Sequence, residues 1–213
     1  MKTSEPAAAG GVNRLDNFHS ESVPDQEPTS WRNKGGWRRA LLDSLETVLL
    51  SLVLFLSINL VSARIRVESI SMQPTLYEGN FVIVNKLAYR LGGPGRGDVI
   101  VFYYPPDPEQ EPYIKRVIGL PGDHLRIEAG QVYVNGILLS EPYTPVATNH
   151  GGEWDVPEGS LFVMGDNRNN SSDSRAWGMV PLENVIGKAF VVYWPPEQWG
   201  LLSFPYAAAA SER

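Results

Sequence analysis

The sequence contains no cysteine and only three histidines in its 213 residues. The absence of cysteine excludes thiol catalysis, disulfide bonds and cysteine-based zinc sites. The histidines, His19, His124 and His150, lie far apart in the sequence, so we expect neither a metal cluster nor a bound cofactor. The net charge of −6 provides no basic field, which disfavours a nucleic-acid partner. No Rossmann or phosphate-loop glycine pattern is present.

Large apolar side chains are scarce in the first 36 residues of the chain. Residues 1–36 are rich in Pro, Gly, Ser, Asp and Glu, and such a segment cannot bury enough surface to offset its chain entropy. We therefore predict a disordered tail over residues 1–36. Residues 201–213 include the run Ala207 to Ala210 and are predicted to form a flexible C-terminal tail.

Charged residues are also missing from Val48 to Ile58, at the centre of an apolar run from Ala40 to Ala63. As a helix this run would span about 36 Å, enough to cross a hydrocarbon core of about 30 Å. Tryptophan and basic residues precede it, so we predict a transmembrane anchor over residues 37–63 with its N-terminal side in the cytoplasm. A buried helix of a soluble protein and a cleaved secretory signal ending at Val61-Ser62-Ala63 are the alternatives.

After residue 63 the pattern is that of β-strands, because short β-branched or aromatic runs recur between Gly, Pro, Asn and Asp. Asn135-Gly136 between two such runs is a strong hairpin signal. We predict a mainly β protein: an antiparallel sheet catalytic domain over residues 64–200, with a small hairpin lobe at about residues 128–160, preceded by one transmembrane helix. The predicted strands are 64–68, 81–86, 98–104, 113–120, 124–128, 131–134, 137–139, 161–164 and 185–194.

Ser71 lies just after a predicted strand and just before the proline-stiffened turn that begins at Pro74. This context fixes the backbone and leaves the hydroxyl free to point into a cleft. Many serines in such turns only bond the local backbone. A serine hydroxyl needs a neighbouring base before it can act as a nucleophile.

Lys115 is a candidate for that base. Strand alternation places Tyr113, Lys115 and Val117 on one face, so the lysine has aromatic and aliphatic neighbours. Burial disfavours the ammonium form and lowers the lysine pKa towards the range of a general base. The alternative is a lysine whose stem lies on the strand while its amine reaches solvent.

A dense polar segment, Gly165 to Arg175, follows the apolar strand 161–164. Counted from Asp166, Arg168 occupies the third position, where a calcium loop needs an oxygen ligand, so a calcium loop is excluded. Asp173 and Arg175 can form an ion pair, and a hydroxyl such as that of Ser171 can hold a neutral lysine in place. A solvated turn is the simpler interpretation.

Four motifs in order resemble the bacterial type I signal peptidases. They are Ser71-Met-x-Pro-Thr-Leu76 after the anchor, Gly97-Asp-Val-Ile-Val-Phe102, Tyr113-Ile-Lys-Arg-Val-Ile-Gly-Leu-Pro-Gly-Asp123 and Gly165-Asp-Asn-Arg-x-Asn-Ser-x-Asp-Ser-Arg175. The resemblance covers nearly all of residues 64–194 and excludes both tails. The short stretch between Lys115 and Gly165 is similar to that of the compact members of the family.

The resemblance implies a membrane-bound serine endopeptidase that removes N-terminal signal peptides from exported preproteins and cuts after small residues. It implies that Ser71 is the nucleophile and Lys115 the general base. Ser69 matches the serine that joins the oxyanion hole, and Ser171 matches the serine that orients the lysine. Asp173 and Arg175 match the structural ion pair of the loop. The implied partners are signal peptides and the lipid bilayer, and the implied location is the cell membrane, with an internal photosynthetic membrane as the alternative.

Three other interpretations make different predictions. A self-cleaving repressor with a Ser/Lys dyad would need a DNA-binding helical domain before Ala40, and the sequence shows none. A membrane-anchored β module without activity would have no need for four ordered motifs that all fit one catalytic mechanism. An organelle homologue would need a transit peptide, and residues 1–36 lack the acid-poor, Arg-rich composition of one.

Overall fold

A computed structural model describes residues 36–90 and 92–202. The predicted N-terminal tail up to residue 35, with its basic residues, and most of the predicted C-terminal tail lie outside the described residues. The chain divides into two units, Met1–Glu46 and Thr47–Arg213. All of the described β-strands belong to two antiparallel sheets of the second unit. In chain order the elements are α1 (Gly36–Val61), β1 (Ser62–Arg66), β2 (Phe81–Asn85), β3 (Val99–Phe102), β4 (Tyr113–Gly119), β5 (His124–Glu128), β6 (Gln131–Val134), β7 (Ile137–Leu138), β8 (Gly152–Asp155), β9 (Ser160–Met164), η1 (Arg168–Asn170), α2 (Ser174–Trp177), β10 (Val180–Pro181), η2 (Leu182–Asn184), β11 (Val185–Trp194), η3 (Pro196–Gln198) and β12 (Gly200–Leu201).

Helix α1 is the one helix among the described residues that is long and apolar enough to cross a membrane. Its 26 residues correspond to about 39 Å of helix, and none of its side chains is buried. The predicted anchor ended at residue 63, but Ser62 and Ala63 already belong to β1. The helix stops there because the backbone from Ser62 onwards pairs with β2 instead of continuing the helical bonds.

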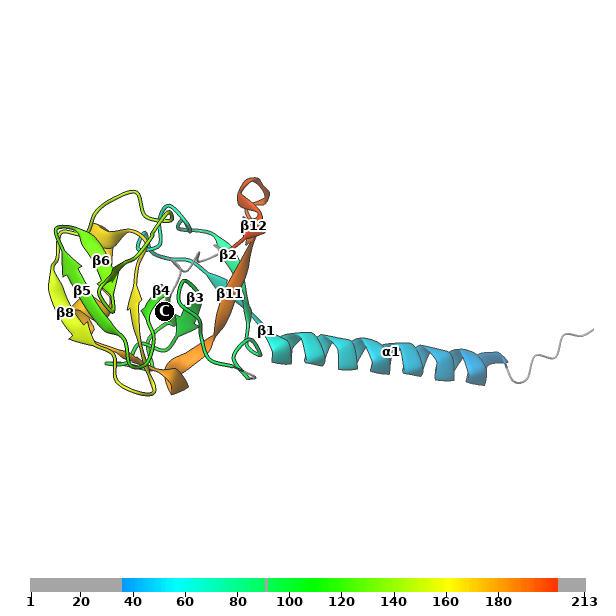
Figure 1. Ribbon diagram of the computed structural model, residues 1–213. Coiled ribbons are helices and arrows are strands. Elements are labelled where there is room, and N and C mark those ends of the chain that lie inside the picture. The colour runs from blue at the N-terminus through cyan, green and yellow to red at the C-terminus, as the bar shows by residue number, and fades with distance from the viewer. Residues whose placement is uncertain (1–35, 91, 203–213) are drawn as a thin grey trace, which may run out of the picture. The chain divides into compact units, whose positions relative to one another are not determined.

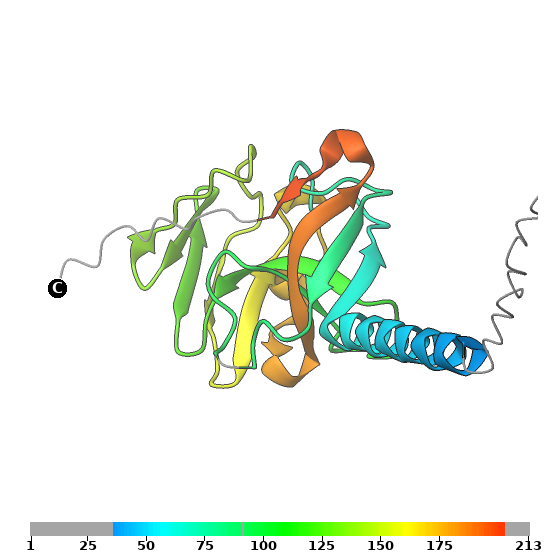
Figure 2. The same cartoon turned by 90° about the vertical axis from the view of Figure 1, so that its right-hand side faces the viewer.

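The larger sheet has the order β1-β2-β11-β3-β4-β9-β10, and β12 pairs with β11. The long strand β11 joins the halves of this sheet, because it pairs with β2 on one side and β3 on the other. The smaller sheet has the order β7-β6-β5-β8. Figure 1 shows the two sheets at opposite sides of the β unit, and Figure 2 shows the curl of the larger sheet around β11. The protein is thus mainly antiparallel β, as predicted.

Alternate side chains of the buried strands pack into different core clusters on the two faces of the larger sheet. In β3, Val99 and Val101 belong to one core cluster while Ile100 and Phe102 belong to another, so this strand is covered on both faces. A third cluster, which includes Leu125 of β5, fills the space beside the smaller sheet. This distribution leaves β3 and β4 as the most enclosed part of the larger sheet.

Two further boundaries of the predicted segments differ from those observed. The smaller sheet begins at His124 of β5, a few residues before the predicted lobe, because β5 is its central strand and pairs with both β6 and β8. At the C-terminus, Leu201 pairs with Val191 and Leu202 is buried in the core. These two residues are therefore part of the ordered β unit, not of the predicted tail.

Candidate active site

Ser71 lies in the segment that connects β1 to β2. Met72 and Leu76, just after it, are fully buried, and the Leu76 amide donates to the Met72 carbonyl at 2.9 Å. The Ser71 carbonyl accepts a hydrogen bond of 3.0 Å from the Asn167 amide of the polar loop. Anchored from both sides in this way, Ser71 is itself only 6% exposed.

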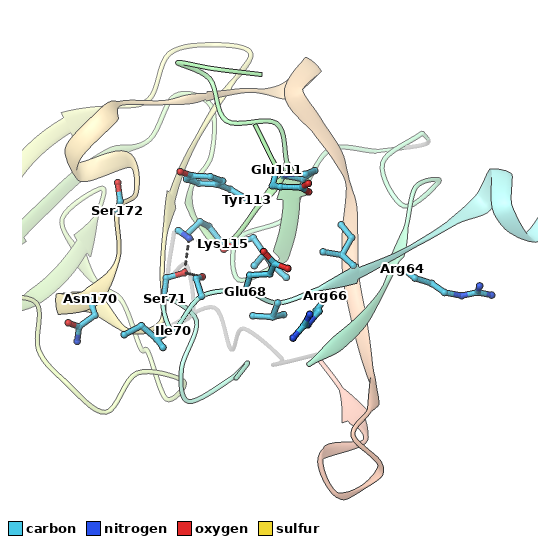
Figure 3. A pocket seen from close by; sticks show the side chains of 15 residues that line it. Arg64, Arg66, Glu68, Ile70, Ser71, Glu111, Tyr113, Lys115, Asn170 and Ser172 are labelled. Carbon is cyan, nitrogen blue, oxygen red and sulfur yellow. Dashed lines mark hydrogen bonds between the residues drawn. The ribbon is translucent and has the colours of Figure 1, made fainter. Parts of the chain in front are cut away.

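Lys115 approaches Ser71 from the middle of β4. Its Nζ donates to the Ser71 Oγ at 2.8 Å and to the Ile114 carbonyl at 3.1 Å. The residue is 4% exposed, so the amine has exchanged most of its water for these two oxygens. The predicted pair of hydroxyl and amine is therefore in direct contact, as drawn in Figure 3.

Burial is the main cause that lowers the pKa of Lys115, from its ordinary value of 10.5 to about 8. The carboxylates of Asp173 and Asp166 act in the opposite direction and raise it. The desolvation of the ammonium outweighs these two charges. A substantial fraction of the amine is consequently neutral at mildly alkaline pH, and only the neutral form can accept a proton.

Ser69 and Ser171 occupy different positions relative to the pair. The Ser69 Oγ is 3.1 Å from the Ser71 Oγ, so its hydroxyl borders the reacting oxygen. The Ser171 Oγ is buried without a hydrogen-bond partner. A Cβ placed on Gly165 would come within 2.3 Å of the Ser171 Oγ and 2.4 Å of the Ser71 carbonyl oxygen. The structure therefore packs the Ser171 hydroxyl against Gly165 and next to the nucleophile segment, but no hydrogen bond to Lys115 is present among the described residues.

The polar loop is held by Asp173. This carboxylate pairs with Arg175 at 2.7 Å, accepts the Gly165 amide at 3.0 Å and caps the N-terminus of α2. Arg175 also donates to the Arg168 carbonyl at 2.6 Å and to the Thr148 hydroxyl at 2.7 Å. The ion pair thus links both ends of the loop to each other and to the chain before β8.

The buried ion pair of Arg116 and Asp166, which the sequence analysis missed, holds together the segments that carry the site. Arg116 and Asp166 are 2.6 Å apart, and both side chains are fully buried. Asp166 also accepts a hydrogen bond of 2.5 Å from the Thr75 hydroxyl. Strand β4, the polar loop and the segment after Ser71 therefore meet at one carboxylate. The sequence signals only that each charge is unusual: Arg116 lies within an apolar strand, and Asp166 comes two residues after one.

Aromatic rings cover the side of Lys115 that faces away from Ser71. The Tyr113 ring centroid lies 5.4 Å from the Lys115 Nζ, and Tyr113 stacks on Tyr104 at 4.6 Å. Trp177 at the end of α2 packs edge-on against Tyr104 at 5.6 Å. These rings are part of the apolar environment that keeps water from the amine.

A cavity of about 600 Å³ opens beside the Ser71–Lys115 pair. Its walls come from the β1 strand and the residues after it on one side, and from the start of β4 on the other. Apolar side chains, including Ile65, Ile70 and Ile114, line the cavity together with charged ones, and Figure 3 shows Ile70 beside Ser71 and Arg64 farthest from the pair. Among the described residues, no three His, Asp or Glu side chains gather to hold a metal ion.

This site can carry out acyl transfer. It contains a hydroxyl in contact with a buried amine, a second hydroxyl beside the reacting oxygen and an elongated cavity with room for an extended peptide. His124, the histidine of the smaller sheet, is bonded to Asp155 at the surface of that sheet and does not line the cavity.

Comparison with known proteins gives concordant matches. The family model described as signal peptidase, peptidase S26, matches residues 41–194. The chain is 40% identical over 183 residues to a probable signal peptidase I-2 of Synechocystis sp., which covers 82% of this chain and 83% of the relative. It is 42% identical over 191 residues to a signal peptidase I of Leptolyngbya laminosa, covering 86% of this chain and 93% of the relative. A thylakoidal processing peptidase 1, chloroplastic, of Arabidopsis thaliana is 35% identical over 142 residues, covering 62% of this chain and 42% of the relative.

Proposed function

This chain belongs to the signal peptidase family, peptidase S26, and we propose that it is a membrane-bound serine endopeptidase that removes N-terminal signal peptides with a Ser71–Lys115 dyad. The observation that carries the proposal is the contact of 2.8 Å between the Lys115 Nζ and the Ser71 Oγ in a buried setting. A buried amine with a lowered pKa is one of the few groups that can replace histidine as the base for a serine.

In the first half of the reaction, neutral Lys115 takes the proton of the Ser71 hydroxyl as its oxygen attacks the scissile carbonyl carbon. The carbonyl electron pair moves to oxygen, which gives a tetrahedral oxyanion. Lys115, now an ammonium, donates its proton to the leaving amine as the peptide bond breaks. The products of this half are the mature protein and a signal peptide esterified to Ser71.

In the second half, the regenerated neutral amine accepts a proton from water while the water oxygen attacks the ester carbonyl. The Ser71 oxygen leaves and regains its proton from Lys115, and the signal peptide is released as a carboxylic acid, which loses its proton to solvent. The same amine thus serves as base and then as acid in each half.

Stabilisation of the oxyanion is assigned to the Ser69 hydroxyl together with the Ser71 amide. The position of the Ser69 Oγ, 3.1 Å from the Ser71 Oγ, supports this role because the oxyanion forms next to the attacking oxygen. Ser171 is assigned the role of holding the neutral lysine. Its buried hydroxyl has no hydrogen-bond partner in the structure, which supports this role because an unsatisfied buried hydroxyl is costly in free energy.

The cavity supports the preference for small residues at the first and third positions before the cut. Apolar residues that line the cavity, such as Ile70 and Ile114, would exclude bulky side chains by size if they form shallow pockets beside the dyad. An extended peptide places alternate side chains towards the same wall, so the first and third residues share one requirement.

The membrane location rests on α1 and on the basic residues before it. We propose a single-pass protein of the cell membrane with the N-terminus in the cytoplasm and residues 64–202 outside. An internal photosynthetic membrane is the alternative, and the similarity to the thylakoidal processing peptidase of Arabidopsis is the observation that supports it.

The experiment is cleavage of a signal-bearing preprotein by the full-length chain in detergent, followed by mass measurement of the products. The wild type and the exposed-lysine control Lys86→Ala should release the mature protein at equal rates, whereas Ser71→Ala and Lys115→Ala should release almost none. A near-wild-type rate for Lys115→Ala would overturn the dyad. No cleavage by the folded wild type would overturn the proposed activity.

A further inference from the structure

The far end of the catalytic cavity is lined by four charged side chains, Arg64, Arg66, Glu68 and Glu111. All four are exposed, and none has an ion pair or hydrogen bond within the described part of the chain. Other surface charges, such as Lys188 with Asp98, do find partners. Because these four charges have no partner in the protein, they are available to interact with charged side chains of a bound substrate.

These charges follow an order along the chain. Arg64, Arg66 and Glu68 alternate outwards, while Ala63, Ile65 and Val67 pack on the core. From the rise of a fully extended chain, Glu68 can lie at most about 10 Å from Ser71 along the backbone, Arg66 at most about 17 Å and Arg64 at most about 23 Å. The carboxylate is therefore nearest the nucleophile, and the guanidinium groups are farther away.

Glu111 lies on the opposite wall. It precedes Tyr113, whose ring borders the cavity, and Figure 3 shows Glu111 beside Tyr113, with Glu68 and Arg66 across the cavity and Arg64 farthest from the dyad. A peptide between the walls thus meets two carboxylates first and then two guanidinium groups.

The direction of the substrate follows from the proposed function, on which this inference rests. A signal peptide still has its apolar segment in the bilayer, so the residues before the cut run from the membrane towards Ser71. Strand β1 runs the same way, because it begins directly after α1 and leads to Ser71. Within the described residues β1 pairs on one side only, with β2, so its other edge is open to an extended peptide.

We infer that Glu68 and Glu111 select a basic residue at about the fourth position before the cut, and that Arg66 selects an acidic residue at about the sixth. The positions come from the same rise of about 3.3 Å per residue applied to an extended substrate beside β1. Since these charges lie at an exposed rim, each match is worth only a two- to fivefold change in rate constant. This charge order adds to the requirement for small residues nearest the dyad.

The test uses the full-length enzyme in detergent and six preproteins that differ only at the fourth or the sixth position before the cut, which carries Lys, Gln or Asp. For the wild type we expect kcat/KM to fall in the order Lys, Gln, Asp at the fourth position and in the reverse order at the sixth. The spread should shrink at high salt, because ions screen exposed charges.

Charge reversal gives the decisive comparison. Glu68→Lys/Glu111→Lys should invert the order at the fourth position, whereas the neighbouring surface control Glu109→Lys should keep the wild-type order. The ratio of two kcat/KM values is independent of the fraction of folded enzyme, so a loss of stability does not mimic the result. Equal cleavage of all six preproteins, or an order unchanged by charge reversal, overturns this inference alone. Failure of the wild type to cut the Gln preproteins overturns the proposed function as well.

Discussion

At the scale of single residues, the site depends on one amine that is kept from water. Lys115 has apolar and aromatic neighbours on the side away from Ser71, and its burial outweighs two nearby carboxylates. A lysine on an exposed strand would remain an ammonium at neutral pH and could not accept a proton. Burial of this amine lowers the free energy of unfolding at pH values where the unfolded chain carries the proton.

That cost leads to a first prediction, for Lys115→Met. The native pKa of about 8 lies below the ordinary 10.5, so the unfolded chain binds a proton more tightly than the folded one. The wild type should therefore gain stability as the pH rises from 8 to 10.5, and at pH 7 it should carry a penalty of about 3 kcal/mol. Lys115→Met should be more stable than the wild type at pH 7, with the difference lost above pH 10.5. Denaturant unfolding at several pH values checks this, and a variant less stable at pH 7 contradicts it.

A second prediction concerns the hydroxyl beside the nucleophile. Removal of one oxyanion donor costs about 100- to 1,000-fold in kcat, so Ser69→Ala should be slow but measurably active. The surface control Ser140→Ala should match the wild type, and Ser71→Ala should be inactive. Single-turnover cleavage separates these outcomes; full activity of Ser69→Ala would remove Ser69 from the oxyanion hole.

At the scale of elements, the polar loop is pressed against the nucleophile segment at Gly165. A side chain there would collide with the Ser171 Oγ and with a backbone oxygen of Ser71, and backbone cannot move aside without displacing the nucleophile. Gly165→Ala should therefore lose both activity and thermal stability. Gly93→Ala is the matched control, because a Cβ at Gly93 meets nothing within 4 Å. Melting and cleavage assays on both variants test this; an active, stable Gly165→Ala would show that the loop is free to shift.

The strands that the sequence predicts best are those made of β-branched and aromatic residues. The predicted strands 124–128, 131–134 and 185–194 have the observed bounds. The missed strand β8, Gly152–Asp155, contains no β-branched residue and is set by its pairing with β5. The short strands β10 and β12 likewise exist through their neighbours, β9 and β11. Local propensity cannot report such tertiary effects.

For the candidate active site, the sequence predicts the catalytic pair but not the residues that support it. Alternation and apolar neighbours favoured a buried Lys115, and the ordered motifs indicated its partner through the family resemblance. Neither source predicts that Arg116 and Asp166 meet, because their side chains lie on elements 50 residues apart that only the sheet brings together. The roles of Ser69 and Ser171 remain predictions, and Ser69→Ala tests the first of them.

At the scale of the whole molecule, a span-length helix leads directly into a β unit. The chain should sediment with membranes, resist extraction by salt and dissolve in detergent. Protease added outside intact spheroplasts should digest residues 64–202 and spare an N-terminal tag, with a cytoplasmic marker protein as control. Release by salt, or a mature N-terminus near Arg64, would contradict the proposed anchor.

The central claim is that neutral Lys115 deprotonates Ser71, and the pH dependence of kcat/KM for one neutral preprotein tests it most directly. The neutral fraction of an amine increases tenfold per pH unit below its pKa, so kcat/KM should increase tenfold per unit up to about pH 8 and level off above it. A rate that is independent of pH between 6 and 9, or an acidic limb with a midpoint near 10.5, the ordinary lysine value, would contradict the claim.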